Sequence, residues 1–174
     1  TFRDENGDRP VDYLFTDAPG EWFQRWAINR DSDEGVGARW VSDNADAFMI
    51  VADREALAGE SMGTARGSLQ RIAMRLAAER GDRPVALVWT KSDVDIPPEM
   101  EEAVRGAVTD AMPDAVEHSV SVVGGPDGDP LRHKGTGLVE LLPWATGIKR
   151  SGVRLPPPAS TSEDPLFIFG SRKS

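Results

Sequence analysis

The chain has 174 residues, 39% of them hydrophobic, which suits one globular domain that can bury a core. Its formal net charge of -9 argues against the basic surface that nucleic acids and anionic membranes need, so neither is expected as a direct partner. The absence of cysteine excludes disulfides and thiolate metal sites and fits a cytoplasmic protein, and no segment reaches the roughly 20 apolar residues that span a bilayer.

The chain begins with a pattern that predicts a β-hairpin. The sequence TFRDENGDRPVDYLF predicts a strand over residues 1–4, a turn at Asn6-Gly7 and a second strand that ends at Phe15. A polar turn that starts with Asp17 follows this second strand. Ligands of parallel α/β sheets bind just beyond the carboxyl ends of the strands, so Asp17 is placed to meet one.

The middle of the chain alternates helical and strand patterns. Trp22, Phe23 and Trp26 recur at helical spacing, and the continuous apolar run in DAFMIVAD is typical of a strand buried on both faces. The predicted elements are a helix over residues 21–29, a polar, glycine-rich loop over 30–37, a buried strand over 46–53, a loop over 57–64 and a helix over 65–80 that ends at Gly81.

A second strand with a polar end lies further along the chain. Residues 85–93, VALVWTKSD, are apolar and β-branched until the final four, which are polar. We expect this strand end and the one at Asp17 to belong to one sheet and to converge on one crevice.

The C-terminal part of the chain adds two helices and a strand. Pro143 should kink or shorten the last helix unless it starts a new turn. We expect residues 1–150 to form one α/β domain and the Pro/Ser-rich residues 151–174 to be a linker or tail. The predicted elements are a helix from 97 to about 111, a strand over 116–123 and a helix within 135–148.

The two polar strand ends resemble the third and fourth nucleotide-binding motifs of P-loop GTPases. The third motif is Asp-x-x-Gly, here residues 17–20, and the fourth is Asn/Thr-Lys-x-Asp, here residues 90–93. The stretch TDAPGEWFQRW, followed by DAFMIVAD, is similar to the bacterial double-GTPase type of Ras-like domain, in which a Glu follows the motif glycine. The resemblance implies a three-layer, Rossmann-like P-loop GTPase fold, with a mostly parallel sheet and one antiparallel edge hairpin.

The resemblance assigns roles to three residues of the first motif. Asp17 would hold Mg²⁺ through a water molecule, because a hard cation prefers oxygen ligands. Gly20 would donate its backbone N–H to the γ-phosphate, a close approach that suits a residue without a side chain. Glu21 stands where Ras-like GTPases carry a water-orienting Gln; its carboxylate can accept a proton but adds negative charge, so slow hydrolysis is expected.

The second motif would recognise the base of GTP or GDP. Asp93 would accept two hydrogen bonds, from the N1–H and the exocyclic amine of guanine, and adenine offers neither in that arrangement. Lys91 would lay its aliphatic stem along the base plane, and Thr90 replaces the commoner Asn of this motif with a smaller hydroxyl. Residues 123–125 match the family's fifth motif loosely.

One motif of the family is missing from these residues. The phosphate-binding loop GxxxxGK[ST] precedes both motifs in the family but occurs nowhere in this sequence. We expect the first strand, the phosphate loop and the first switch loop to lie upstream of Thr1. The alternative is a degenerate GTPase fold that has lost them.

Three hypotheses for function follow. The first is a GTP-binding, slowly hydrolysing switch domain that works with a protein effector or regulator. The second is a pseudo-GTPase that serves as a protein-interaction module without nucleotide turnover. The third is an unrelated flavodoxin-like or receiver-like domain, which predicts that residues 90–93 do not line the same pocket as Asp17.

Overall fold

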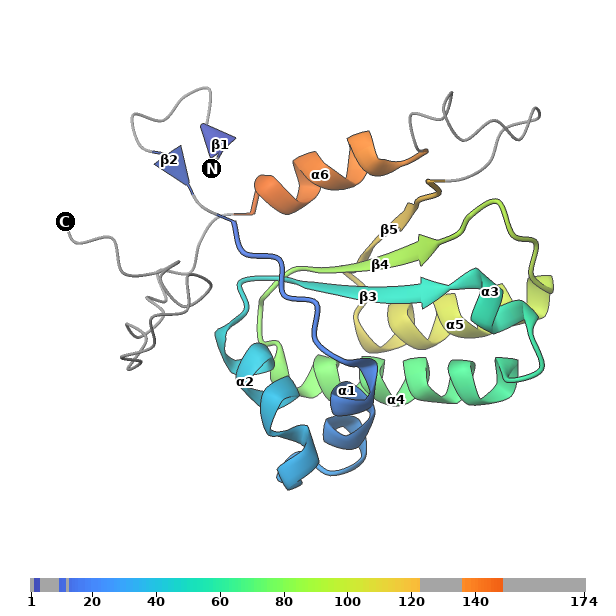
Figure 1. Ribbon diagram of the computed structural model, residues 1–174, viewed down its shortest axis with the longest axis horizontal. Helices are drawn as coiled ribbons and strands as arrows, with labels where there is room; N and C mark the ends of the chain where they lie inside the picture. Colours follow the sequence, from blue (N-terminus) through green and yellow to red (C-terminus); the bar gives the residue numbers. More distant parts are fainter. Residues whose placement is uncertain (1, 4–9, 12, 123–135, 149–174) are drawn as a thin grey trace, which may run out of the picture.

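The protein has three layers, with a parallel β-sheet between two layers of helices (Figure 1). The computed structural model describes residues 2–3, 10–11, 13–122 and 136–148. Within these residues the sheet has the strand order β3-β4-β5, and neighbouring strands run parallel. The strands are β3 (Phe48–Asp53), β4 (Val85–Thr90) and β5 (Val116–Ser119).

Helices lie on both faces of this sheet. Helices α4 and α5 cover one face, α6 lies over the other, and α1 and α2 pack beside α4 (Figure 1). The helices are α1 (Gly20–Ile28), α2 (Val36–Asn44), α3 (Arg54–Ala58), α4 (Met62–Glu79), α5 (Pro98–Ala111) and α6 (Leu138–Thr146), with a short 3₁₀ helix at Asp33–Gly35.

Strand β4 is the central strand, and its sequence explains why. All five residues of the run VALVW, 85–89, are buried. Side chains alternate between the two faces of a strand, so a run without polar residues requires a covered sheet on both sides. The apolar sequence of β4 therefore places this strand in the middle of the three layers.

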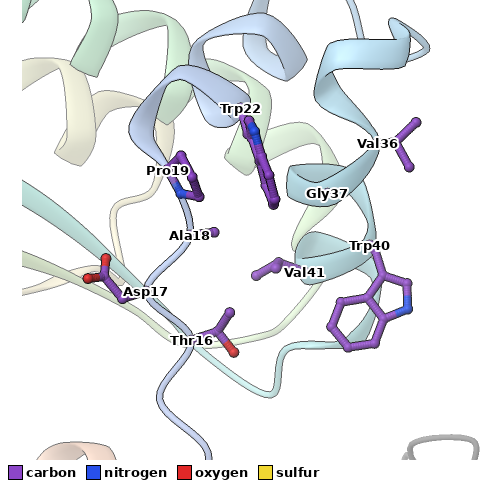
Figure 2. A pocket seen from close by; sticks show the side chains of 9 residues that line it. All are labelled: Thr16, Asp17, Ala18, Pro19, Trp22, Val36, Gly37, Trp40 and Val41. Carbon is purple, nitrogen blue, oxygen red and sulfur yellow. The ribbon is translucent and has the colours of Figure 1, made fainter. Parts of the chain in front are cut away.

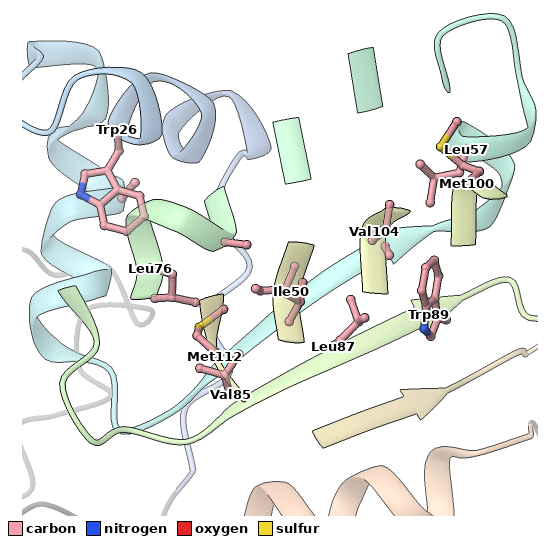
Figure 3. Packing of buried hydrophobic residues seen from close by; sticks show 14 residues of the cluster. Trp26, Ile50, Leu57, Leu76, Val85, Leu87, Trp89, Met100, Val104 and Met112 are labelled. Carbon is pink, nitrogen blue, oxygen red and sulfur yellow. The ribbon is translucent and has the colours of Figure 1, made fainter. Parts of the chain in front are cut away.

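The main hydrophobic core lies between the sheet and helices α4 and α5 (Figure 3). Ile50 and Leu87 from the strands pack with Val104 of α5 and Leu76 of α4 in this cluster. Trp26 brings α1 into the same cluster and is almost fully buried. Burial of these large side chains supplies the main favourable free energy of folding.

The opposite face of the sheet is covered only in part. Val88, Val120 and Leu141 belong to a second, smaller buried cluster under α6. Among the described strands, β3 pairs with β4 alone, and Val51 on β3 is 54% exposed. One edge of β3 and part of its outer face are therefore open in the described part of the chain.

Most of the helices and strands predicted from the sequence are present, with small shifts at their ends. The strand predicted over 46–53 and the helices predicted over 21–29, 65–80 and 97–111 are confirmed. Gly81 has φ of +62°, the left-handed conformation expected of a glycine that follows a helix. In the last helix, α6 continues past Pro143 to Thr146.

The loop predicted over residues 30–37 is wrong in part. It contains the 3₁₀ helix and the first residues of α2. The side chain of Ser32 accepts a hydrogen bond from the Gly35 N–H at 3.1 Å, and α2 buries Ala38 and Ser42. Packing against the rest of the protein therefore stabilises helices where the local sequence is polar and rich in glycine.

Two other predicted boundaries are also wrong. The loop predicted over 57–64 includes the end of α3 and the start of α4. The last strand ends at Ser119 rather than at residue 123, and Ser121 then forms an isolated antiparallel bridge with Thr136. Val120 still contacts the end of β4, because its N–H donates to the Trp89 carbonyl oxygen at 2.8 Å and its carbonyl oxygen accepts from the Ser92 N–H at 3.1 Å.

The N-terminal residues do not join the main sheet. Strands β1 (Phe2–Arg3) and β2 (Pro10–Val11) pair antiparallel in a separate two-stranded sheet, so an edge hairpin of the main sheet is not confirmed. The strand predicted to reach Phe15 is wrong, because residues 13–19 have no regular structure. Leu14 is 75% exposed, as expected of a segment with no neighbouring strand to pack against.

The predicted tail, residues 151–174, lies outside the described residues. In the part of the chain that the structure describes, every helix is too short or too polar to cross a bilayer.

We expect Leu87→Ala to lower the free energy of unfolding by about 2–5 kcal/mol, because it removes a buried side chain from the central strand and leaves a cavity. The matched control is Leu142→Ala on α6, where the side chain is 47% exposed and the expected change is within about 0.5 kcal/mol. Urea denaturation followed by circular dichroism measures both. Equal losses for the two variants would contradict the assigned core.

Candidate functional site

The carboxyl ends of β3 and β4 meet at one edge of the sheet. The parallel register pairs Asp53, the last residue of β3, with Thr90, the last residue of β4. Lys91 follows directly, and residues 91–94 form a turn in which the Val94 N–H donates to the Lys91 carbonyl oxygen at 2.9 Å. This strand edge therefore presents the whole fourth motif.

Lys91 is held by two carboxylates. Its Nζ donates to Asp53 Oδ2 at 3.0 Å and also to Glu55 Oε2. These hydrogen bonds, Glu55 first and Asp53 second, raise the pKa of Lys91 above its usual value, so the ammonium stays charged. The backbone of Lys91 has φ of +52°, which is uncommon for a residue with a side chain.

Asp93 is oriented by a serine on the other side of the turn. The Ser121 hydroxyl donates a hydrogen bond to Asp93 Oδ1, and the Ser92 N–H donates to the Val120 carbonyl oxygen at 3.1 Å. The bond from Ser121 lowers the pKa of Asp93 below its usual range. Asp93 is therefore an ionised carboxylate with a fixed direction at an exposed edge.

Ser121 is a site residue that the sequence analysis missed. The predicted fifth motif, residues 123–125, lies outside the described residues. The signal that could have identified Ser121 is a serine two residues beyond the end of β5, the strand that runs parallel to the strand carrying the fourth motif.

The buried Trp89 lies directly before the fourth motif, and its position is fixed by the side chains around it. Trp89 Nε1 donates to Glu117 Oε1 at 2.8 Å, and Arg105 Nε donates to Glu117 Oε2 at 2.8 Å. The guanidinium carbons of Arg54 and Arg105 lie 5.5 and 5.9 Å from the Trp89 ring centroid. Arg105 holds the pKa of Glu117 below its usual value. Trp89 is therefore held in place by burial, by its hydrogen bond to Glu117 and by the two arginines beside its ring.

The first motif lies in a different setting, at the start of α1. Residues 16–19, Trp22 and several α2 residues line an apolar pocket of about 520 Å³ (Figure 2). A Cβ at Gly37 would lie 2.3 Å from the Trp22 ring, so this close approach of α1 and α2 requires glycine. In Figure 2 the Asp17 carboxylate points away from the two Trp side chains that line the pocket.

Gly20 and Glu21 occupy the first turn of α1. Both are exposed, and nothing lies within 4 Å of the position that a Cβ on Gly20 would take. No side chain accepts a hydrogen bond from the first backbone N–H groups of this helix. Such a helix start is suited to an anion.

The structure does not bring the two motifs into one pocket, contrary to the prediction. The described residues that line the pocket at Asp17 do not include Thr90, Lys91 or Asp93. The physical reason is that residues 13–19 do not pair with the sheet, so Asp17 does not follow a strand aligned with β3 and β4. This separation is what the hypothesis of an unrelated α/β domain predicts, and sequence comparison decides between the two.

Asp17 could hold a magnesium ion only together with a nucleotide. Its carboxylate is exposed and forms no hydrogen bond or ion pair with another described residue. No group of three or more His, Asp or Glu side chains suited to a metal ion lies within the described residues. Magnesium commonly binds one or two carboxylates together with water and substrate phosphates, and a lone, accessible carboxylate fits that arrangement.

Comparison with known proteins identifies a family. A family model described as Double-GTPase 2 matches residues 1–145, which include both motifs and all the described strands and most of α6. Neither the curated proteins nor the solved structures gave a significant match. The match includes both of the motifs that resemble those of P-loop GTPases, so it argues against the unrelated flavodoxin-like or receiver-like domain.

We expect Ser121→Ala to raise the pKa of Asp93 toward its usual value, because the variant removes the hydrogen bond that stabilises the ionised carboxylate. Carbon-13 NMR of the Asp93 carboxyl group during a pH titration measures this shift. Ser119→Ala, at an exposed position of β5, is the matched control and should leave the pKa of Asp93 unchanged. An unaltered titration in Ser121→Ala would contradict the assigned bond.

Proposed function

Because the chain belongs to the Double-GTPase 2 family, we propose that it is a guanine-nucleotide-binding switch domain that hydrolyses GTP slowly. The observation that carries this proposal is the family match, which spans both nucleotide-binding motifs. The family indicates a GTP-binding, GTPase-like function in general. The roles of individual residues are part of the proposal and are argued from their geometry.

Base recognition is assigned to the edge formed by Thr90, Lys91 and Asp93. The ionised carboxylate of Asp93, directed by Ser121, is suited to accept hydrogen bonds from the N1–H and the amine of guanine. The stem of Lys91 lies along the base plane, and the hydroxyl of Thr90 takes the place of the commoner Asn. Adenine lacks the two donors in this arrangement, so Asp93 selects guanine over adenine.

Phosphate and metal recognition are assigned to the start of α1. The Gly20 N–H donates to the γ-phosphate, at a helix start that no side chain caps. Asp17 would hold Mg²⁺ through a water molecule, and the ion would supply positive charge to neutralise the phosphates. Glu21 orients the attacking water, but its negative charge beside the γ-phosphate opposes hydrolysis, so turnover is slow without a protein partner that supplies a cation.

The chain needs a phosphate-binding loop from outside residues 1–174 to complete this site. No GxxxxGK[ST] sequence occurs among these residues. The open edge of β3 and the exposed Val51 leave room for a further strand in the sheet. A strand and loop inserted there would lie beside the recognition edge, and residues 13–15, which have no regular structure, would then have a neighbour to pair with.

We expect the natural full-length protein to bind GTP and GDP, but not ATP, in the presence of Mg²⁺. The 174 residues alone should bind guanine nucleotides far more weakly, because they lack a phosphate loop. Isothermal titration calorimetry on both proteins measures the affinities, and release of inorganic phosphate measures turnover. Binding without turnover would favour the pseudo-GTPase, and absence of binding by the full-length protein would favour an interaction module that needs no nucleotide.

We expect Asp93→Asn to weaken GTP binding by about 100-fold, because Asn replaces one acceptor oxygen with a donor and removes the negative charge from the other hydrogen bond. Any residual binding of ATP should change far less. Asp95→Asn removes the same charge from an exposed position two residues further on and is the matched control, with little expected effect. Equal losses of GTP and ATP affinity in Asp93→Asn would contradict guanine selection by this residue.

A further inference from the structure

The end of β3 and the first turn of α3 contact the base-recognition edge through three consecutive residues. We propose that Asp53, Arg54 and Glu55 are positioning residues for nucleotide binding, because they hold Lys91 and the turn that follows it in place. This inference rests on the proposed function, since it assigns to these residues a role that is exerted through Lys91.

The three residues reach the turn at both of its ends. Asp53 and Glu55 accept hydrogen bonds from Nζ of Lys91, at 3.0 Å in the case of Asp53. Arg54 Nη1 donates to the carbonyl oxygen of Val94 at 3.3 Å. Lys91 and Val94 are the first and last residues of the turn that contains Asp93, so all four residues of the turn lie between these contacts.

Two of the positioning residues, Asp53 and Arg54, are themselves held by other contacts. Asp53 Oδ1 accepts a hydrogen bond from the Glu55 N–H at 2.9 Å and so caps α3, which leaves Oδ2 directed at Lys91. Arg54 Nη2 donates to Glu101 Oε2 at 2.8 Å, and its side chain is 15% exposed beside Trp89. These anchors distinguish the arrangement from an ordinary surface ion pair, in which both partners are free to move.

Lys91 is restrained both at its backbone and at the end of its side chain. Within the described residues it is the only non-glycine residue with positive φ, so its backbone is held in an uncommon conformation. Two carboxylates fix the ammonium at the far end of the side chain. With both ends fixed, the aliphatic stem has little freedom, and a stem that must lie along a base plane then loses little entropy on binding.

Charge and positioning predict opposite effects when these carboxylates are removed. A nucleotide is an anion, so removal of two nearby negative charges should by electrostatics alone strengthen its binding. Loss of positioning should weaken binding, because Lys91 becomes free to adopt other arrangements. The sign of the change therefore separates the two explanations.

The experiment uses Asp53→Asn combined with Glu55→Gln in the natural full-length protein, with GDP and Mg²⁺ as the probe. Asn still caps a helix well, so α3 is retained, and thermal denaturation checks the fold. We expect binding of GDP to weaken by about fivefold, the modest size that ion pairs at partly exposed positions allow. The matched control is Asp82→Asn combined with Asp110→Asn, two exposed positions before β4 and late in α5.

A double-mutant cycle tests whether the effect passes through Lys91. Lys91→Ala alone should weaken GDP binding, and adding the Asp53 and Glu55 substitutions should cause no further loss. Inosine diphosphate, which lacks the exocyclic amine of guanine, gives a second readout. The variant of Asp53 and Glu55 should weaken GDP and inosine diphosphate by the same factor, because Lys91 contacts the base plane and not the amine.

Each remaining outcome overturns a defined part of the proposal. Unchanged or tighter GDP binding in the variant of Asp53 and Glu55, or losses that add to those of Lys91→Ala, would refute the positioning role alone. A larger loss for GDP than for inosine diphosphate would place the effect on Asp93 instead. Absence of GDP binding by the unaltered full-length protein would refute the proposed function, and the positioning role with it.

Discussion

The parallel pairing of β3 with β4 is the constraint on which the candidate site depends. The pairing places Asp53 beside Thr90, and this brings the start of α3 to the turn that begins at Lys91. The register is fixed by packing, since Leu87 and Trp89 lie in the main core on one face of β4 and Ala86 and Val88 lie in the smaller cluster on the other. A slip by one residue would exchange the two faces of the strand and would also separate Asp53 from Lys91.

The recognition edge changes from apolar to charged within two residues. Trp89 is fully buried in the main core, and Lys91, two residues later, is exposed and paired with carboxylates. Glu117 and the two arginines beside the indole bridge this change, because they satisfy its N–H and cover its ring. A polar turn that directly follows a close-packed strand can hold a carboxylate such as Asp93 in one direction.

The negative charge of the chain bears on how it handles a nucleotide. Its net charge is -9, and Lys91, the cation of the recognition edge, is already paired with two acids. Attraction of the triphosphate must therefore come from backbone N–H groups, a metal ion and a phosphate loop. The uncapped start of α1 and the accessible Asp17 suit the first two roles, and the sequence contains no candidate for the third.

The sequence by itself determined the elements with strong periodicity and the two motifs, because strands such as 85–90 and helices such as 98–111 are set by local pattern. It also identified the family, since both motifs lie within contiguous residues. The tertiary structure decided that residues 13–15 form no strand, that Ser121 bonds to Asp93, and that α3 holds Lys91. Those features depend on contacts between residues far apart in the chain. A local sequence pattern does not indicate which distant residues will be in contact.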